Sequence, residues 1–107
     1  MRCSTGWAKI YIAGPLDEIE QVCRFFALEG ACVTVTPTRY IYTGGEETGV
    51  EVGMINYPRF PMTQRDMTER AVELGKKIMI RCHQLTFTVM TPENTTYYSR
   101  KEELGVR

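Results

Sequence analysis

Two strand-like runs joined by a glycine-containing turn occupy the middle of the chain, and they restrict its fold more than any other feature. Apolar and polar residues alternate in residues 33–36 and again in residues 50–54, which is the period of a half-buried β-strand. The six-residue segment between the runs, TGGEET, contains two adjacent glycines and is typical of a hairpin loop. Pro37 has no backbone N–H to donate, which predicts that the first strand lies at a sheet edge. We therefore expect an antiparallel hairpin here.

One further strand and one helix are predicted on each side of the hairpin. Residues 9–13 are a short apolar run, and residues 85–89 alternate between apolar and polar, as strands do. Apolar residues recur at three- and four-residue steps in residues 17–30 and 63–82, which indicates two amphipathic helices. The first residue of each helical segment, an aspartate and a threonine respectively, is predicted to cap its N-terminus.

The predicted order of elements is β-α-β-β-α-β, and it defines the expected fold class. The chain is predicted to be one α+β domain spanning residues 1–107, a ferredoxin-like sandwich with an antiparallel sheet and two helices on one face. Residues 95–107 offer a short further strand before the chain end. We expect residues 1–8 and 101–107 to be flexible, because chain ends are commonly poorly ordered.

The charge balance and the absence of long apolar runs exclude two classes of protein. Lys plus Arg number 13 and Asp plus Glu number 13, which argues against a dedicated binder of double-stranded nucleic acid. No membrane-spanning run or secretory signal is found, so we expect a cytoplasmic location, or the host cytoplasm if the chain is viral. The uncovered sheet face would present threonines and tyrosines, and this favours a homo-oligomer.

Metal and cofactor sites are not predicted. The single histidine, His83, follows Cys82 directly, and neighbouring helix residues point about 100° apart, so the two are not predicted to form a Cys–His catalytic pair. His83 also lacks a second ligand at a suitable spacing. No motif indicates a cofactor.

The segment that follows the hairpin is the predicted binding surface. Its aromatic residues could stack on a base, its arginines could hold phosphates, and asparagines could recognise a base edge. The free amides at the start of the second helix add an anion site. The predicted ligand-binding residues are Tyr40, Tyr42, Asn56, Tyr57, Arg59, Phe60, Thr63, Arg65 and Asn94. We therefore expect an anionic, nucleotide-like small-molecule ligand, with Arg59 as its main anchor.

Two segments resemble parts of an enzyme family. KIYIAGP, residues 9–15, resembles the opening strand and Gly-Pro turn of nucleoside 2-deoxyribosyltransferases and related nucleotide N-glycosidases. EETGVEVGMI, residues 46–55, is similar to their motif that contains the nucleophilic glutamate. The resemblance implies an enzyme that acts on the glycosidic bond of a nucleoside or nucleotide, with Glu51 as its catalytic residue.

A second resemblance leads to a different function. In length, neutral charge and predicted oligomeric α+β plan, the chain resembles small phage-encoded anti-defence proteins that sequester cyclic nucleotide or cyclic ADP-ribose signals (anti-CBASS and anti-Thoeris sponges). This resemblance implies a non-enzymatic, oligomeric binding protein, which is our main sequence-based hypothesis. The glycosidic-bond enzyme that uses Glu51 is the first alternative, and a protein-interaction module that binds through the open sheet face or its edge is the second.

Overall fold

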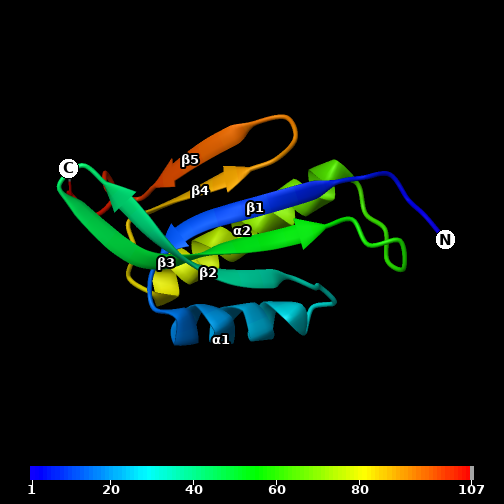
Figure 1. Cartoon of the computed structure of the whole chain (residues 1–107), viewed down its shortest axis with the longest axis horizontal. Helices are drawn as coiled ribbons and strands as arrows, with labels where there is room; N and C mark the ends of the chain where they lie inside the picture. The colour runs from blue at the N-terminus through cyan, green and yellow to red at the C-terminus, as the bar shows by residue number, and fades with distance from the viewer. Residues whose placement is uncertain (107) are drawn as a thin grey trace.

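Within residues 1–106, the part of the chain that the computed structural model describes, five strands and two helices form one α+β domain. The elements are β1 (Trp7–Ala13), α1 (Leu16–Ala27), β2 (Thr34–Tyr42), β3 (Gly45–Ile55), α2 (Gln64–Arg81), β4 (Thr86–Met90) and β5 (Thr95–Ser99). All neighbouring strands pair antiparallel, in the order β2-β3-β1-β4-β5 (Figure 1). The predicted fold class is confirmed, with β5 added at one edge. Arg107, at the end of the tail expected to be flexible, lies outside the described residues.

The β2–β3 hairpin is longer and its turn tighter than predicted. Pairing continues without interruption from Thr34 opposite Gly53 to Tyr42 opposite Gly45, so only two residues form the turn. Gly44 has a φ of 88°, a conformation that glycine adopts without the steric cost of a side chain. The predicted six-residue loop is therefore wrong, because most of its polar residues continue the strands. Pro37 lies in the edge strand β2, as predicted.

The two helices cover one face of the sheet and bury their apolar sides against it. Thr63 caps α2 as predicted, and its side-chain hydroxyl accepts a hydrogen bond from the Asp66 N–H at 3.1 Å. The cap predicted for α1 is wrong, because this helix begins after Pro15 and Asp17 lies within its first turn. There the carboxylate still favours the positive end of the helix dipole. Among the described residues, no helix is long and apolar enough to cross a membrane.

The residues of β1 point alternately towards the core and towards the opposite face of the sheet. Ala8, Ile10 and Ile12 are buried under the helices. The residues between them, including Lys9 and Tyr11, are only partly buried and stand on the other side, because successive strand residues point to opposite faces. We call this side, which the helices leave uncovered, the open face. The homo-oligomer predicted to form through it stays a prediction.

Candidate active site

Sheet register places Glu51 at the centre of the open face. In β3, Glu51 lies opposite Tyr11 of β1 on one side and Thr36 of β2 on the other. Tyr11 in turn lies opposite Thr88 of β4. Directly opposite residues on one face of a sheet are close neighbours. A carboxylate, a phenol and two hydroxyl groups therefore form one row across four strands.

Lys9 is the ionic partner of Glu51. Its Nζ lies 3.2 Å from Oε1 of Glu51, and the two side chains are 43% and 33% exposed. The same ammonium lies 5.9 Å from the centroid of the Trp7 ring, at the outer limit of a cation–π contact. Because both charged groups still contact water, the pair stabilises the fold by only about 0–1 kcal/mol. The pair matters less for stability than because the ammonium of Lys9 balances the negative charge of Glu51.

Tyr40 is held against the sheet beside these residues. Its hydroxyl donates a hydrogen bond to the backbone carbonyl of Val50 at 2.6 Å. Its ring lies so close to Gly49 that a Cβ there would be 2.7 Å from Cε2 of Tyr40. Burial is the main reason that the pKa of the Tyr40 phenol rises to about 12; a hydrogen bond with the Ile12 backbone lowers it, and the charges of Glu51 and Tyr11 raise it further. Tyr40 therefore stays protonated near neutral pH.

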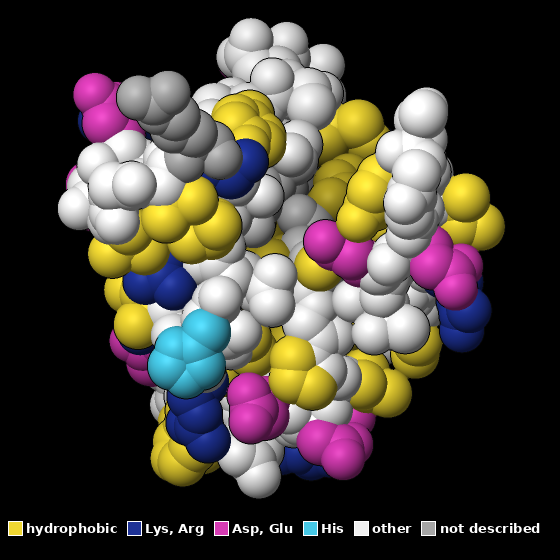
Figure 2. Space-filling view, turned by 90° about the vertical axis from the view of Figure 1, so that its left-hand side faces the viewer, with side chains coloured by type: hydrophobic (Ala, Val, Ile, Leu, Met, Phe, Trp, Pro, Cys, Tyr) yellow, Lys and Arg dark blue, Asp and Glu magenta, His cyan; other side chains and the backbone are white. Residues whose placement is uncertain are grey.

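A cleft opens beside Tyr40, at the end of the sheet from which the β2–β3 hairpin extends. It consists of two hollows of about 460 and 600 Å³, which share Ala13, Glu47 and Gln84 in their walls. We call it the hairpin cleft. Other residues of its walls are Tyr11, Tyr40, Thr86, Thr88, His83 and Lys101. Figure 2 faces this end of the molecule and shows a hollow with hydrophobic and acidic side chains beside it. The cleft is large enough for a small-molecule ligand.

The hairpin contributes acidic side chains to this end of the molecule. Glu47 lines both hollows of the hairpin cleft, and its Oε1 accepts a hydrogen bond from the Tyr42 hydroxyl at 3.3 Å. Glu46 lines one hollow and forms an ion pair with Arg39 at 3.2 Å. Glu46 and Glu51 are each balanced by an ion pair, with Arg39 and Lys9 respectively, and Lys101 also lines the cleft, so the charges at this end of the molecule nearly cancel.

The residues predicted to bind a ligand lie in three separate places. Tyr40 lines the hairpin cleft, and Tyr42 lies at the hairpin tip, about half exposed. A second group lies at the opposite end of the sheet, in the loop that leaves β3, and consists of Asn56, Tyr57, Arg59, Phe60 and Thr63. Arg65 and Asn94 line a third place, a pocket on the helix side of the sheet.

Several residues of the β3 exit loop have structural roles. The side-chain amide of Asn56 donates to the Ser4 carbonyl at 2.8 Å, and its oxygen accepts from the Met62 N–H at 2.9 Å. The rings of Tyr57 and Phe60 lie 6.1 Å apart, tilted by 59°. Asn56 therefore holds the N-terminal segment and the loop together. Arg59 is exposed in the turn between the two aromatic residues.

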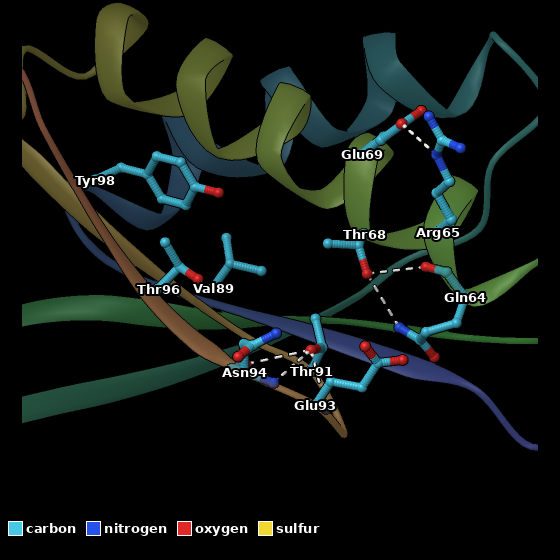
Figure 3. A pocket seen from close by; sticks show the side chains of 10 residues that line it. All are labelled: Gln64, Arg65, Thr68, Glu69, Val89, Thr91, Glu93, Asn94, Thr96 and Tyr98. Atoms are coloured by element: carbon cyan, nitrogen blue, oxygen red, sulfur yellow. Dashed lines mark hydrogen bonds and ion pairs between the residues drawn. The ribbon is translucent and has the colours of Figure 1, made fainter.

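The pocket that contains Arg65 and Asn94 lies between α2 and the β4–β5 hairpin. Its volume is about 290 Å³. Figure 3 shows Arg65 and Glu69 on the helix above it and Tyr98, Thr96 and Asn94 on the strand side. Arg65 Nε lies 3.3 Å from the Glu69 carboxylate, so its charge is already balanced on the helix surface.

Sequence reasoning missed Lys9, Tyr11 and Thr88 as candidate site residues. Each alternates with buried apolar residues in its strand, so the pattern of KIYIA and LTFTVM already places them on the face away from the core. Their proximity to Glu51 depends on the pairing of β1 with β3 and β4. Combining the alternation with the predicted strand order would have found this row of side chains.

Comparison with known proteins finds two solved structures that share this fold. No protein-family model and no curated protein sequence matches the chain. Among solved structures, a phage SAM lyase in its apo state is 17% identical with a TM-score of 0.73, and the match covers 92% of this chain and 94% of that one. A phage SAM lyase in complex with S-methyl-5'-thioadenosine is 16% identical with a TM-score of 0.73, covering 94% and 95%. At this level of identity, the likeness demonstrates a shared fold.

This comparison contradicts the main functional prediction. We expected a non-enzymatic protein that sequesters a cyclic nucleotide or cyclic ADP-ribose signal, but both structural neighbours are lyases, which are enzymes. Of the sequence-based hypotheses, the alternative of an enzyme that uses Glu51 agrees better with the comparison. The error arose because length, charge and fold class are shared by small proteins with unrelated activities.

Proposed function

We propose that the chain is an enzyme that cleaves S-adenosylmethionine (SAM) and releases S-methyl-5'-thioadenosine (MTA). The substrate would bind on the open face at the edge of the hairpin cleft. The observation that best supports this site is the partly exposed carboxylate of Glu51, which lies opposite Tyr11 and close enough to Tyr40 to raise its pKa. The fold shared with two phage SAM lyase structures supports the reaction class. A phage origin for the chain belongs to the same proposal.

The chemistry of the candidate site fits a sulfonium ion. The sulfonium of SAM has a positive charge but no hydrogen-bond donor, so a carboxylate and the faces of aromatic rings can recognise it. Glu51 supplies the carboxylate, and Tyr11 and Tyr40 supply the rings. MTA is neutral, so this attraction disappears when the carbon–sulfur bond breaks. The site therefore favours the substrate over its product.

The reaction needs no external nucleophile. The carboxylate of the substrate's own methionine part can attack the carbon attached to sulfur, so that a carbon–oxygen bond forms and the carbon–sulfur bond breaks. The electron pair of the broken bond stays on sulfur, and the products are MTA and a five-membered lactone. No proton is transferred in this step. The raised pKa of Tyr40 agrees with a role in binding and positioning rather than as an acid or base.

The test is incubation of the purified protein with SAM, followed by chromatography of the products. We expect MTA to accumulate. Glu51→Gln should lower kcat/KM by roughly a hundredfold, in the range found when one electrostatic contact to the reacting group is removed. Glu69→Gln is the matched control, because Glu69 also forms an exposed ion pair, at 3.3 Å with Arg65, but lies on α2.

The products distinguish the competing activities. Release of free adenine instead of MTA would indicate cleavage of the glycosidic bond, as the resemblance to nucleoside 2-deoxyribosyltransferases implies. Recovery of intact SAM would refute the proposed function. Equal activity of Glu51→Gln and Glu69→Gln would place the reaction elsewhere in the protein.

A further inference from the structure

The ammonium group of Lys9 already occupies a cation site on the open face. It lies between the Glu51 carboxylate, at 3.2 Å, and the Trp7 ring, at 5.9 Å from the centroid. An acidic group and an aromatic face are the same two features that would attract a sulfonium. The protein thus satisfies the charge of Glu51 with one of its own side chains.

We propose that Lys9 determines the specificity of this site by competing with the substrate cation for Glu51. The proposal rests on the proposed function. In the empty site Lys9 pairs with Glu51. A bound sulfonium takes over the interaction with the carboxylate, and Lys9 moves aside. When cleavage leaves the neutral MTA, Lys9 pairs with Glu51 again.

The surroundings of Lys9 allow this exchange. Its cross-strand neighbours are Gly53 in β3 and Met90 in β4, and both are uncharged. Gly53 has no side chain, and the hydroxyl of Thr34 fills the space beside it, 2.7 Å from where a Cβ would be, so the ammonium of Lys9 has to move towards solvent. The Lys9 side chain is 43% exposed, so the ammonium regains contact with water when it leaves Glu51. The cost of separating a pair of this kind is small.

The competition predicts different effects on charged and neutral ligands. A sulfonium has to displace the ammonium of Lys9, whereas MTA has no charge with which to compete. Lys9 therefore weakens the binding of SAM and leaves the binding of MTA almost unchanged. After each reaction the Lys9–Glu51 pair forms again, and the next sulfonium has to displace Lys9 before it can bind to Glu51.

The experiment compares wild-type protein, Lys9→Met and Lys9→Arg by calorimetry for MTA and, because the enzyme consumes SAM during a titration, by the KM of the reaction for SAM. Methionine keeps the length of the apolar stem and removes the charge. We expect Lys9→Met to bind SAM about two- to fivefold more tightly, which corresponds to the typical strength of an exposed ion pair. Its affinity for MTA should stay the same, and Lys9→Arg should behave like the wild type. The tighter binding of SAM should appear as a lower KM.

A control and two outcomes make the test decisive. Lys76→Met removes an exposed lysine from α2 and should change neither affinity. Weaker binding of SAM to Lys9→Met would mean that Lys9 contacts the substrate, and it would overturn the proposal. Equal changes for SAM and MTA, or no change for either, would overturn it as well. If wild-type protein binds neither ligand, the proposed function itself fails, which is a separate result.

Discussion

The ring of Tyr40 lies against the backbone of Gly49, with no space for a side chain between them. Gly49 is buried in β3 and pairs with Ala13 of β1 and Thr38 of β2. A methyl group on Gly49 would meet the Ile12 carbonyl oxygen as well as the Tyr40 ring. The close packing at this glycine therefore sets the position of Tyr40 over the sheet.

Gly49→Ala should destabilise the protein and displace Tyr40. We expect the free energy of unfolding to fall by about 1–3 kcal/mol, as is typical when a group is forced into a well-packed site. Denaturant unfolding measures this change. Gly45→Ala is the control, because the methyl group would meet only the ring of the exposed Tyr42, and its effect should stay within about 0.5 kcal/mol. Equal stability of the two variants would contradict the observed packing.

The raised pKa of Tyr40 makes stability depend on pH in the alkaline range. The phenol has an ordinary pKa of 10 and a pKa of about 12 in the folded protein, so folding favours the protonated form. Its contribution is complete below pH 10 and is lost as the pH rises towards about 12. We expect thermal stability to decline less steeply in Tyr40→Phe than in the wild type across this interval.

Comparison with Tyr40→Phe is needed because the Cys23 thiol loses its proton in an overlapping pH range. Burial, with smaller contributions from Glu20 and Cys82, raises the pKa of the Cys23 thiol from 9 to about 11. The decline due to Cys23 should be the same in wild type and Tyr40→Phe. If the stability of the two proteins declined in parallel with rising pH, folding would not raise the pKa of Tyr40, and the prediction would be wrong.

Arg59→Ala tests where the ligand binds. Arg59 lies in the exposed loop after β3, whereas Glu51 lies on the open face next to the hairpin cleft. If SAM binds at Glu51, Arg59→Ala should change kcat/KM by less than about twofold, because removal of a distant, exposed charge has little effect in physiological salt. A loss as large as that in Glu51→Gln would support the β3 exit loop as the binding surface. Enzyme kinetics of the two variants under identical conditions provides the measurement.

The fold could be predicted from the sequence because each element has a clear local pattern. Two amphipathic segments and the alternating runs are enough to define the order of elements, and Pro37 correctly indicates an edge strand. The hairpin length was missed because residues 46–48 are polar. Such residues look like a loop, yet they extend a two-stranded ribbon whose side chains face water on both sides.

The candidate active site was predicted only in part. Tyr40 and, as an alternative, Glu51 were identified, but the sequence grouped Tyr40 with Arg59 and Phe60, which lie at the other end of the sheet. Nearness along the chain was a poor guide, because a strand of 11 residues carries its two ends about 35 Å apart. The partners of Glu51 come from β1, some forty residues earlier, and only strand pairing brings them together.

The alternation along β1 has a consequence for how this protein can evolve. Its even-numbered residues, such as Ile10, support the core, and its odd-numbered residues, Lys9 and Tyr11, face the candidate site. A single-residue insertion or deletion within the strand would exchange the two sets. Side chains in β1 can therefore vary one at a time, whereas a change in the length of the strand would disrupt the core and the candidate site together. Changes in length should be tolerated at Thr43 and Gly44, where the hairpin turns and no register depends on them.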